Sequence, residues 1–147
     1  MPDEAMDILL VEDNPDDAAL FARTLKRASI PARLHVATDG KEALDFVFGT
    51  GRYTGRDTST QPKVIFLDLK MPRVNGLEVL RRLKGDLRIR TIPIVVFSSS
   101  QEESDLIESY HLQVNSYIVK PIDFAAFGES VRLICEYWLQ LNQTPKL

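Results

Sequence analysis

The sequence contains little cysteine and no long apolar run. Among 147 residues there is one cysteine, Cys135, so no disulfide framework can form. Cys135 lies in an apolar helical stretch, where a buried thiol is expected rather than a reactive one. No apolar run approaches the roughly 18 residues of a membrane span, and the acidic amino terminus lacks the basic segment of a secretory signal. These absences lead us to expect a soluble protein of a reducing cytoplasm.

An excess of basic residues is also missing. The net charge is −3 and the pI is about 5.4, which argues against generic nucleic-acid binding. One basic cluster is present, and we interpret it as a solvated helix face and loop: Arg81, Arg82, Lys84, Arg88 and Arg90. With 44% hydrophobic and 27% charged residues, the chain suits one globular domain over 1–147 with a core at about 6–142.

Short apolar runs alternate with helical patterns along the whole chain. The runs predict strands at residues 8–11, 34–37, 64–68, 92–97 and 116–119. Helical spacing and capping residues predict helices at 15–28, 39–49, 75–84, 102–111 and 123–142. This alternation indicates an α/β fold, with a parallel sheet covered by helices on both faces. The polar stretch 49–62 is expected to be a long surface loop, either functional or mobile.

Polar side chains follow four of the predicted strands. Glu12 and Asp13 follow the first strand, Asp68 ends the third, Ser98 follows the fourth and Lys120 follows the fifth. The carboxyl ends of parallel strands meet at one edge of a sheet, which is where ligands bind. Each residue alone also has a structural interpretation, because acids and serines cap helices and lysines are common at surfaces. Their coincidence at one edge favours a functional site.

Three carboxylates at one edge require positive charge nearby. A close carboxylate pair repels by something like 4 kcal/mol at an effective dielectric of about 20. Oxygen-only ligands favour a hard cation such as Mg²⁺, and Lys120 adds a compact positive charge. Together with the hydroxyl of Ser98 and a central Asp68, these groups suit phosphoryl transfer to a carboxylate. Movement of Ser98 toward a phosphoryl group would vacate space for an aromatic such as Tyr117, which outlines a two-state switch.

At these residues the sequence resembles the receiver domains of two-component response regulators. The resemblance covers about residues 6–140, and its motifs are Glu12-Asp13, the segment 67–72 followed by Asn75-Gly76, Ser98, Tyr117 and Lys120-Pro121. It implies a flavodoxin-like (βα)5 doubly wound parallel sheet with strand order 2-1-3-4-5. It also implies a phosphoacceptor signalling protein, and not an enzyme.

The resemblance implies a metal site and a phosphoacceptor. Asp68 would accept the phosphoryl group from a sensor histidine kinase. Asp13, Asp68 and the backbone carbonyl of Lys70 would hold Mg²⁺, and Glu12 would act through water.

The resemblance also implies roles around the phosphoryl group. Lys120 and Ser98 would contact it, and Tyr117 would report its presence. The Lys120–Pro121 peptide bond would be cis.

Other segments resemble the single-domain regulators that are paired with bacterial phytochromes. These segments are the loop 49–62 with Tyr53, the run 109–117 and the ending Glu136-Tyr137-Trp138-Leu139. They imply a bacteriophytochrome as a candidate kinase.

Three rival interpretations have weaker support. A phosphatase of the haloacid-dehalogenase type needs a second carboxylate two residues after the first, where this chain has Lys70. A flavin module would need a phosphate-binding loop after the first strand, but the acidic residues of 12–17 would repel phosphate. A transcription factor needs an output domain, and about five residues follow the last predicted helix.

The last helix carries more apolar surface than one core can cover. Its expected inner face comprises Phe124, Phe127, Val131, Ile134 and Trp138. A second stripe comprises Leu133, Tyr137 and Leu141, widened by Leu139. We therefore predict a homodimer surface around Tyr137, Trp138 and Leu141; the alternative is a monomer with scattered surface apolar residues.

Overall fold

A single five-stranded parallel sheet forms the centre of the protein. The computed structural model describes residues 6–145, and the strand order is β2-β1-β3-β4-β5 with every neighbouring pair parallel. The strands are β1 (Met6–Val11), β2 (Ala32–Ala37), β3 (Val64–Leu67), β4 (Ile94–Ser98) and β5 (Ser116–Val119). The predicted fold class and strand order are confirmed.

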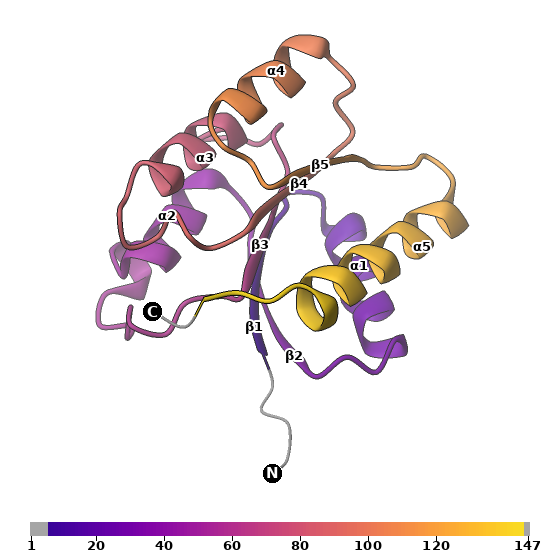
Figure 1. The fold of residues 1–147 in the computed structure, drawn as a ribbon, viewed down its shortest axis with the longest axis horizontal. Helices are drawn as coiled ribbons and strands as arrows, with labels where there is room; N and C mark the ends of the chain where they lie inside the picture. Colours follow the sequence, from indigo (N-terminus) through magenta and orange to yellow (C-terminus); the bar gives the residue numbers. More distant parts are fainter. Residues whose placement is uncertain (1–5, 146–147) are drawn as a thin grey trace.

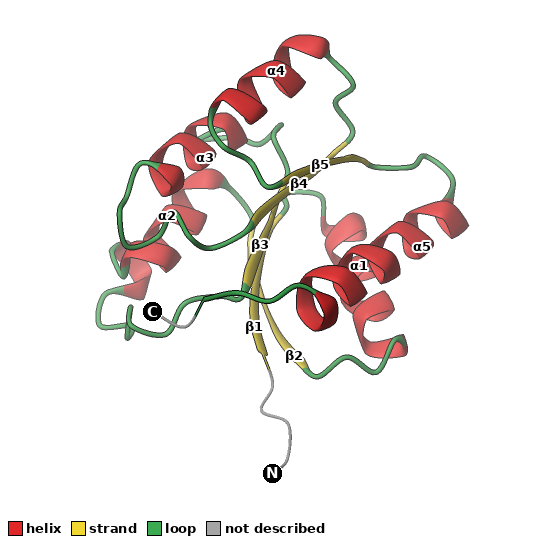
Figure 2. Ribbon diagram, viewed as in Figure 1, coloured by secondary structure: helices red, strands yellow, loops and turns green. Residues whose placement is uncertain are grey.

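Helices cover both faces of this sheet. The α-helices are α1 (Pro15–Arg27), α2 (Gly40–Phe48), α3 (Gly76–Lys84), α4 (Glu103–His111) and α5 (Phe124–Cys135). A π-helical segment, η2 (Glu136–Leu141), continues α5. Helices α1 and α5 lie on one face, and α2, α3 and α4 lie on the other (Figures 1 and 2). No helix within residues 6–145 is long and apolar enough to span a membrane.

Alternate residues of the central strands fill two separate cores. In β3, Phe66 faces the core under α1 and α5, whereas Leu67 faces the core under α2 and α3. Phe66 packs on Phe21 of α1 with ring centroids 5.1 Å apart. Burial of one such side chain contributes about 1.5–3 kcal/mol, which is why these strands are apolar on both faces.

Helix caps fix where the chain turns at the carboxyl ends of the strands. The Asn14 side chain accepts a hydrogen bond of 2.9 Å from the backbone N–H of Asp16, so α1 begins shortly after β1. The Asn75 side chain accepts one of 3.0 Å from the N–H of Glu78 at the start of α3. Both caps fix the points at which the loops after β1 and β3 enter their helices.

The loop 49–62 docks on α2. It contains a 3₁₀ turn, η1 (Gly51–Tyr53). The Arg56 guanidinium lies 4.0 Å from the ring centroid of Phe46 and donates a hydrogen bond of 2.9 Å to the carbonyl of the same residue. The Gln61 side chain donates to the carbonyl of Val47 at 2.9 Å. These contacts tie the second half of the loop to α2.

The expected burial pattern of the last helix is wrong at two residues. Phe124 was expected in the core but is 66% exposed, because it is the first residue of α5. Leu139 was expected in the outer stripe but is 2% exposed and lies in the core. The π-helical hydrogen bonding of Glu136–Leu141 explains the burial of Leu139. A π-helix has more residues in each turn than an α-helix, so the side chains within it leave the positions that an α-helical period predicts.

Lys84 is an exception to the expected solvated basic face. Its Nζ atom donates hydrogen bonds to the carbonyls of Arg90 and Ile92, at 3.0 and 3.2 Å, and to the Asn115 side chain at 2.7 Å. Partial burial lowers the pKa of Lys84 to about 8. This lysine joins the end of α3 to the segments before β4 and β5.

Candidate functional site

Asp68 lies at the carboxyl edge of the sheet, directly after β3. Its side chain is almost fully buried, and its backbone N–H donates to the carbonyl of Val11 at 3.0 Å, which places it beside the end of β1. The following loop folds back tightly against it at Gly76. A Cβ atom at position 76 would lie 2.3 Å from the backbone oxygen of Asp68, so only glycine fits there.

Glu12, Asp13 and Asp68 converge at this edge. Each offers a carboxylate oxygen, and these atoms lie within 4.8 Å of one another. Glu12 and Asp68 are buried, whereas Asp13 is exposed and lines a cavity of about 400 Å³. Such an oxygen-only donor set fits a hard divalent cation that keeps some of its water ligands. The structure thus brings together all three side chains of the metal site predicted from the sequence.

Lys120 reaches into the same cluster from the end of β5. Its Nζ atom lies 2.5 Å from Glu12, 2.9 Å from Asp17 and 3.3 Å from Asp68. Burial alone would lower the pKa of Lys120, but its hydrogen bonds to Glu12 and Asp17 raise it above the ordinary value. Lys120 therefore stays charged and offsets part of the carboxylate repulsion.

The charge of Lys120 does not offset all of the effects that oppose ionisation of Glu12. Burial raises the pKa of Glu12 to about 7, with repulsion from Asp68 adding to the shift and Lys120 opposing it. The part of the shift that comes from Asp68 reflects repulsion between two carboxylates at close range. A divalent cation would offset that repulsion, so the residues present fit the metal that the sequence predicts.

Ser98 and Tyr117 are linked through Ser100. Ser98 is fully buried at the end of β4, and its Oγ accepts a hydrogen bond of 3.2 Å from the backbone N–H of Ser100. The Tyr117 hydroxyl donates to the carbonyl of Ser100 at 3.0 Å. Burial raises the pKa of Tyr117, so the hydroxyl keeps its proton. The two predicted switch residues therefore share one loop residue as a partner.

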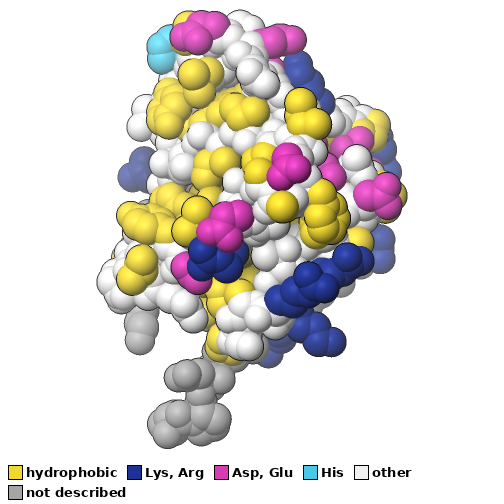
Figure 3. Space-filling model, turned by 90° about the vertical axis from the view of Figure 1, so that its right-hand side faces the viewer, with side chains coloured by type: hydrophobic (Ala, Val, Ile, Leu, Met, Phe, Trp, Pro, Cys, Tyr) yellow, Lys and Arg dark blue, Asp and Glu magenta, His cyan; other side chains and the backbone are white. Residues whose placement is uncertain are grey.

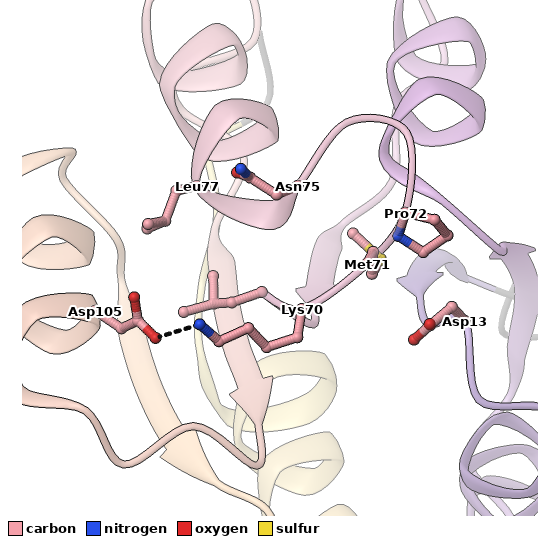
Figure 4. A pocket seen from close by; sticks show the side chains of 8 residues that line it. Asp13, Lys70, Met71, Pro72, Asn75, Leu77 and Asp105 are labelled. Atoms are coloured by element: carbon pink, nitrogen blue, oxygen red, sulfur yellow. Dashed lines mark ion pairs between the residues drawn. The ribbon is translucent and has the colours of Figure 1, made fainter.

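The side chain of Lys70 points away from the acidic cluster. Its backbone N–H faces the Asp68 carboxylate at 3.4 Å, but its Nζ atom pairs with Asp105 of α4 at 3.3 Å. Figure 4 shows Lys70 extending toward Asp105 while Asp13 lies on the opposite side. The Ser100 hydroxyl donates to the same Asp105 oxygen at 2.5 Å.

Two acidic residues of this region are not among the residues predicted from the sequence. Asp17 lies in the first turn of α1, and its place four residues after Asp13 puts it beside the same strand end. Asp105 was not singled out, although it is an acidic residue on the inner face of a helix.

The expected cis peptide bond is wrong. No peptide bond is cis between residues 6 and 145, so Lys120–Pro121 is trans. With the ordinary trans bond, Lys120 already reaches all three carboxylates. The contact therefore does not require the cis form, which costs about 0.5–1 kcal/mol before proline.

Comparison with known proteins decides the family. The response regulator receiver domain matches residues 8–132. The protein belongs to the response regulator receiver family. Receiver domains are signalling proteins that take phosphoryl groups from histidine kinases, and this one has the acidic cluster, the lysine and the buried hydroxyl in one site.

Two curated relatives match this receiver domain over most of their length. The probable methanogenesis regulatory protein FilR2 of Methanothrix harundinacea is 40% identical over 141 residues, which cover 94% of this chain and 86% of FilR2. The response regulator Rcp1 of Synechocystis is 36% identical over 138 residues, which cover 94% of this chain and 92% of Rcp1.

Solved structures of phytochrome-linked regulators are also similar to this receiver. The phosphorylated cyanobacterial phytochrome response regulator RcpA has a TM-score of 0.90 and 35% identity, covering 96% of this chain and 99% of RcpA. The bacteriophytochrome response regulator AtBRR has a TM-score of 0.74 and 44% identity, covering 96% and 100%. Rcp1 has a Mn²⁺-bound structure with a TM-score of 0.89 and 35% identity, covering 95% and 99%. The resemblance to phytochrome-linked regulators is confirmed.

Proposed function

We propose that this receiver works as a phosphorylation-dependent switch in which Asp68 accepts the phosphoryl group of a sensor histidine kinase. The observation that carries the proposal is the position of Lys120, whose Nζ atom lies 3.3 Å from a buried Asp68 oxygen and also contacts Glu12 and Asp17. A positive charge this close to Asp68 supports the proposal, because phosphoryl oxygens on Asp68 would need a cationic partner. Positioning and charge neutralisation supply most of the catalysis in phosphoryl transfer.

The chemistry at Asp68 is a displacement at phosphorus. An Asp68 carboxylate oxygen forms a bond to phosphorus as the phosphorus–nitrogen bond of the kinase phosphohistidine breaks, which leaves an acyl phosphate and a free imidazole. Lys120 pairs with the transferred oxygens, and the buried Ser98 hydroxyl can donate to one of them after a local shift. A Mg²⁺ ion held by Asp13, Asp68 and the carbonyl of Lys70, with Glu12 acting through water, would neutralise further phosphoryl charge.

A phosphoacceptor fits these residues better than a hydrolase of the haloacid-dehalogenase type. That hydrolase needs a carboxylic acid two residues after the nucleophile. Here the residue is Lys70, and its ammonium group is paired with Asp105. A lysine that pairs with a carboxylate stays protonated and is a poor general acid near neutral pH.

Phosphorylation by a small donor tests the assignment of Asp68. The protein is incubated with Mg²⁺ and acetyl phosphate, and intact mass is measured before and after mild base. The parent should gain one base-labile phosphoryl group, Asp68→Asn should gain none, and the exposed-loop control Asp57→Asn should behave as the parent. Labelling of Asp68→Asn to the level of the parent would refute the assignment.

A bacteriophytochrome is our proposed kinase. The support is the similarity to RcpA and AtBRR over nearly the whole of both chains. A phosphorylated bacteriophytochrome kinase should transfer its phosphoryl group to this receiver within minutes, and Asp68→Asn should receive none. Transfer no faster than to an unrelated receiver would contradict this partner. A cytoplasmic location, where such kinases hold their phosphohistidine, stays a prediction.

We also propose a homodimer through the end of α5 and η2. Leu133, Tyr137 and Leu141 are 52%, 48% and 71% exposed. Trp138 lies partly buried behind them, with its ring 4.9 Å from that of Tyr137. Figure 3 shows hydrophobic side chains gathered in several places on the side of the molecule that carries α1 and α5. A twofold arrangement would let each copy cover the same patch of the other.

Sedimentation at tens of micromolar tests the dimer. The parent should sediment as a dimer, and the double variant Tyr137→Ala, Leu141→Ala should sediment as a monomer. The control Leu87→Ala removes a side chain that is 74% exposed on the loop after α3, and it should not change the result. A monomeric parent, with and without acetyl phosphate, would contradict the proposal.

A further inference from the structure

The backbone of Lys70 lies beside the phosphoacceptor Asp68, but its ammonium group contacts a different element. Its backbone N–H faces Asp68 at 3.4 Å, so the root of the side chain lies next to the site. Its ammonium group instead pairs with Asp105 of α4, and its side chain is 58% exposed (Figure 4). The aliphatic stem of lysine is flexible, so the same side chain can turn either to α4 or to the phosphoacceptor.

The side chain of Asp105 is more buried than that of Lys70 and has a further hydrogen-bond partner. Its side chain is 11% exposed, and the Ser100 hydroxyl donates to Oδ2 at 2.5 Å. Ser100 is in turn the residue whose carbonyl accepts the hydrogen bond of Tyr117. Asp105 is thus the fixed partner of the ion pair, and Lys70 is the mobile one.

Helix α4 has few apolar contacts with the rest of the protein. Asp105 and Ser109 are its buried residues, and both are polar. Within residues 6–145, Ser109 Oγ is the buried side-chain polar atom without a hydrogen-bond partner. A helix with a polar inner face gains little from apolar burial, so its position depends on polar contacts, which include those of Asp105 and the ion pair between Glu108 and Arg81 of α3.

We propose that Asp105 is a positioning residue that holds the Lys70 ammonium group away from Asp68 and gives it up when Asp68 is phosphorylated. The inference rests on the function proposed above. An acyl phosphate adds about one negative charge and several acceptor oxygens beside the root of Lys70. The phosphoryl group then competes with Asp105 for one cation. The lifetime of the acyl phosphate and the anchoring of α4 are therefore linked through Lys70.

The competition affects hydrolysis of the acyl phosphate. In that reaction water attacks phosphorus, the bond between phosphorus and the Asp68 oxygen breaks, the protons of water pass to phosphate and solvent, and the carboxylate is restored. Lys70 turned to the phosphoryl group keeps its charge on the phosphoryl oxygens and covers part of the path of water. Asp105→Asn keeps an acceptor for Ser100 but releases Lys70, so it should lengthen the lifetime. An ion pair with an exposed partner is weak, so the expected change in rate is at most about fivefold.

A double-mutant cycle on the decay of the acyl phosphate tests the inference. Phosphate release is followed after removal of acetyl phosphate for the parent, Asp105→Asn, Lys70→Met and the double variant. Asp105→Asn should slow decay about two- to fivefold in the parent. It should have no effect when Lys70 is already Met, and Asp105→Glu should restore decay toward the parent rate. Equal decay of Asp105→Asn and the parent, or the same change with and without Lys70, would overturn the inference.

Hydrogen exchange of the peptide 102–112 supplies a second measurement. Phosphorylation should speed exchange in this peptide of the parent, and unphosphorylated Lys70→Met should already exchange at the faster rate. Unchanged exchange in both comparisons would overturn the link to α4. A parent that accepts no phosphoryl group would overturn the proposed function as well, whereas a labelled parent with equal lifetimes overturns the role of Asp105 alone.

Discussion

Replacement of Lys120 should expose how strongly the acidic cluster opposes folding. Lys120→Met removes the ammonium group that lies 2.5 to 3.3 Å from three carboxylates, but it keeps a side chain of similar length. Both Lys120 and Glu12 are nearly inaccessible, with side chains 8% and 3% exposed. Loss of one partner of a buried ion pair costs about 3–5 kcal/mol, and we expect a loss of this size in the free energy of unfolding without metal at about pH 8.

The loss should shrink when the pH falls. The pKa of Glu12 in the folded protein, about 7, is above the ordinary value of 4.5. The stabilisation from its protonated form is therefore complete below about pH 4.5 and disappears as the pH rises through about 7. Lys120 opposes this rise, so its removal raises the pKa of Glu12 further. For each pKa unit by which Glu12 rises in the variant, acidification should restore about 1.4 kcal/mol of the free energy of unfolding.

Urea unfolding measures the loss in the free energy of unfolding of Lys120→Met under each condition. The conditions are about pH 8 and about pH 6, each in EDTA and in millimolar Mg²⁺. Both acid and Mg²⁺ should restore part of the stability of Lys120→Met. The control is Lys41→Met, because Lys41 forms an ion pair of 2.7 Å with Asp45 but is 51% exposed. The control should lose less than about 1 kcal/mol. A Lys120→Met loss that matches the control, or that is the same at both pH values and with Mg²⁺, would refute the reasoning.

Three further perturbations follow from contacts described above. Gly76→Ala places a Cβ atom 2.3 Å from a backbone oxygen and should lower the free energy of unfolding by about 3 kcal/mol. The control Gly128→Ala, whose Cβ atom would lie 3.8 Å from its nearest neighbour, should be neutral or stabilising. Equal midpoints of urea unfolding for the two variants would contradict the close approach at Gly76. The hydrogen bond from Arg33 lowers the pKa of Asp7 below its ordinary value of 3.8. Asp7→Asn should therefore reduce the free energy of unfolding by about 0.5–1 kcal/mol at neutral pH, and the reduction should vanish as the pH falls through the lowered pKa. A reduction that does not depend on pH would contradict this. Millimolar Mg²⁺ should raise the melting temperature of the parent but not of Asp13→Ala, and an unchanged response in the variant would place the metal elsewhere.

Most of the fold could be predicted because the strands are buried on both faces. Ile65, Phe66 and Leu67 must all be apolar in such a strand, so the sequence shows an unbroken run that ends at Asp68. The residues of the acidic cluster could be predicted for the same reason, since parallel strands all end at one edge.

The remaining features depend on distances between elements or on helix geometry. The pairing of Lys70 with Asp105 joins a loop to a helix that follows one strand later, and no local pattern predicts it. The same holds for Lys84, whose acceptors lie on two other segments. Leu139 was misplaced because a π-helical turn cannot be inferred from apolar spacing, which assumes the α-helical period.

Identification of the phosphorylated residue tests the central claim most directly. The protein is phosphorylated with acetyl phosphate and Mg²⁺, reduced with borohydride and digested, and its peptides are sequenced by mass spectrometry. Borohydride converts an aspartyl phosphate to homoserine and leaves free carboxylates unchanged. We predict homoserine at position 68, in an amount that depends on the phosphodonor. Homoserine at Asp13 or another position, with Asp68 intact, would contradict the assignment of the phosphoacceptor.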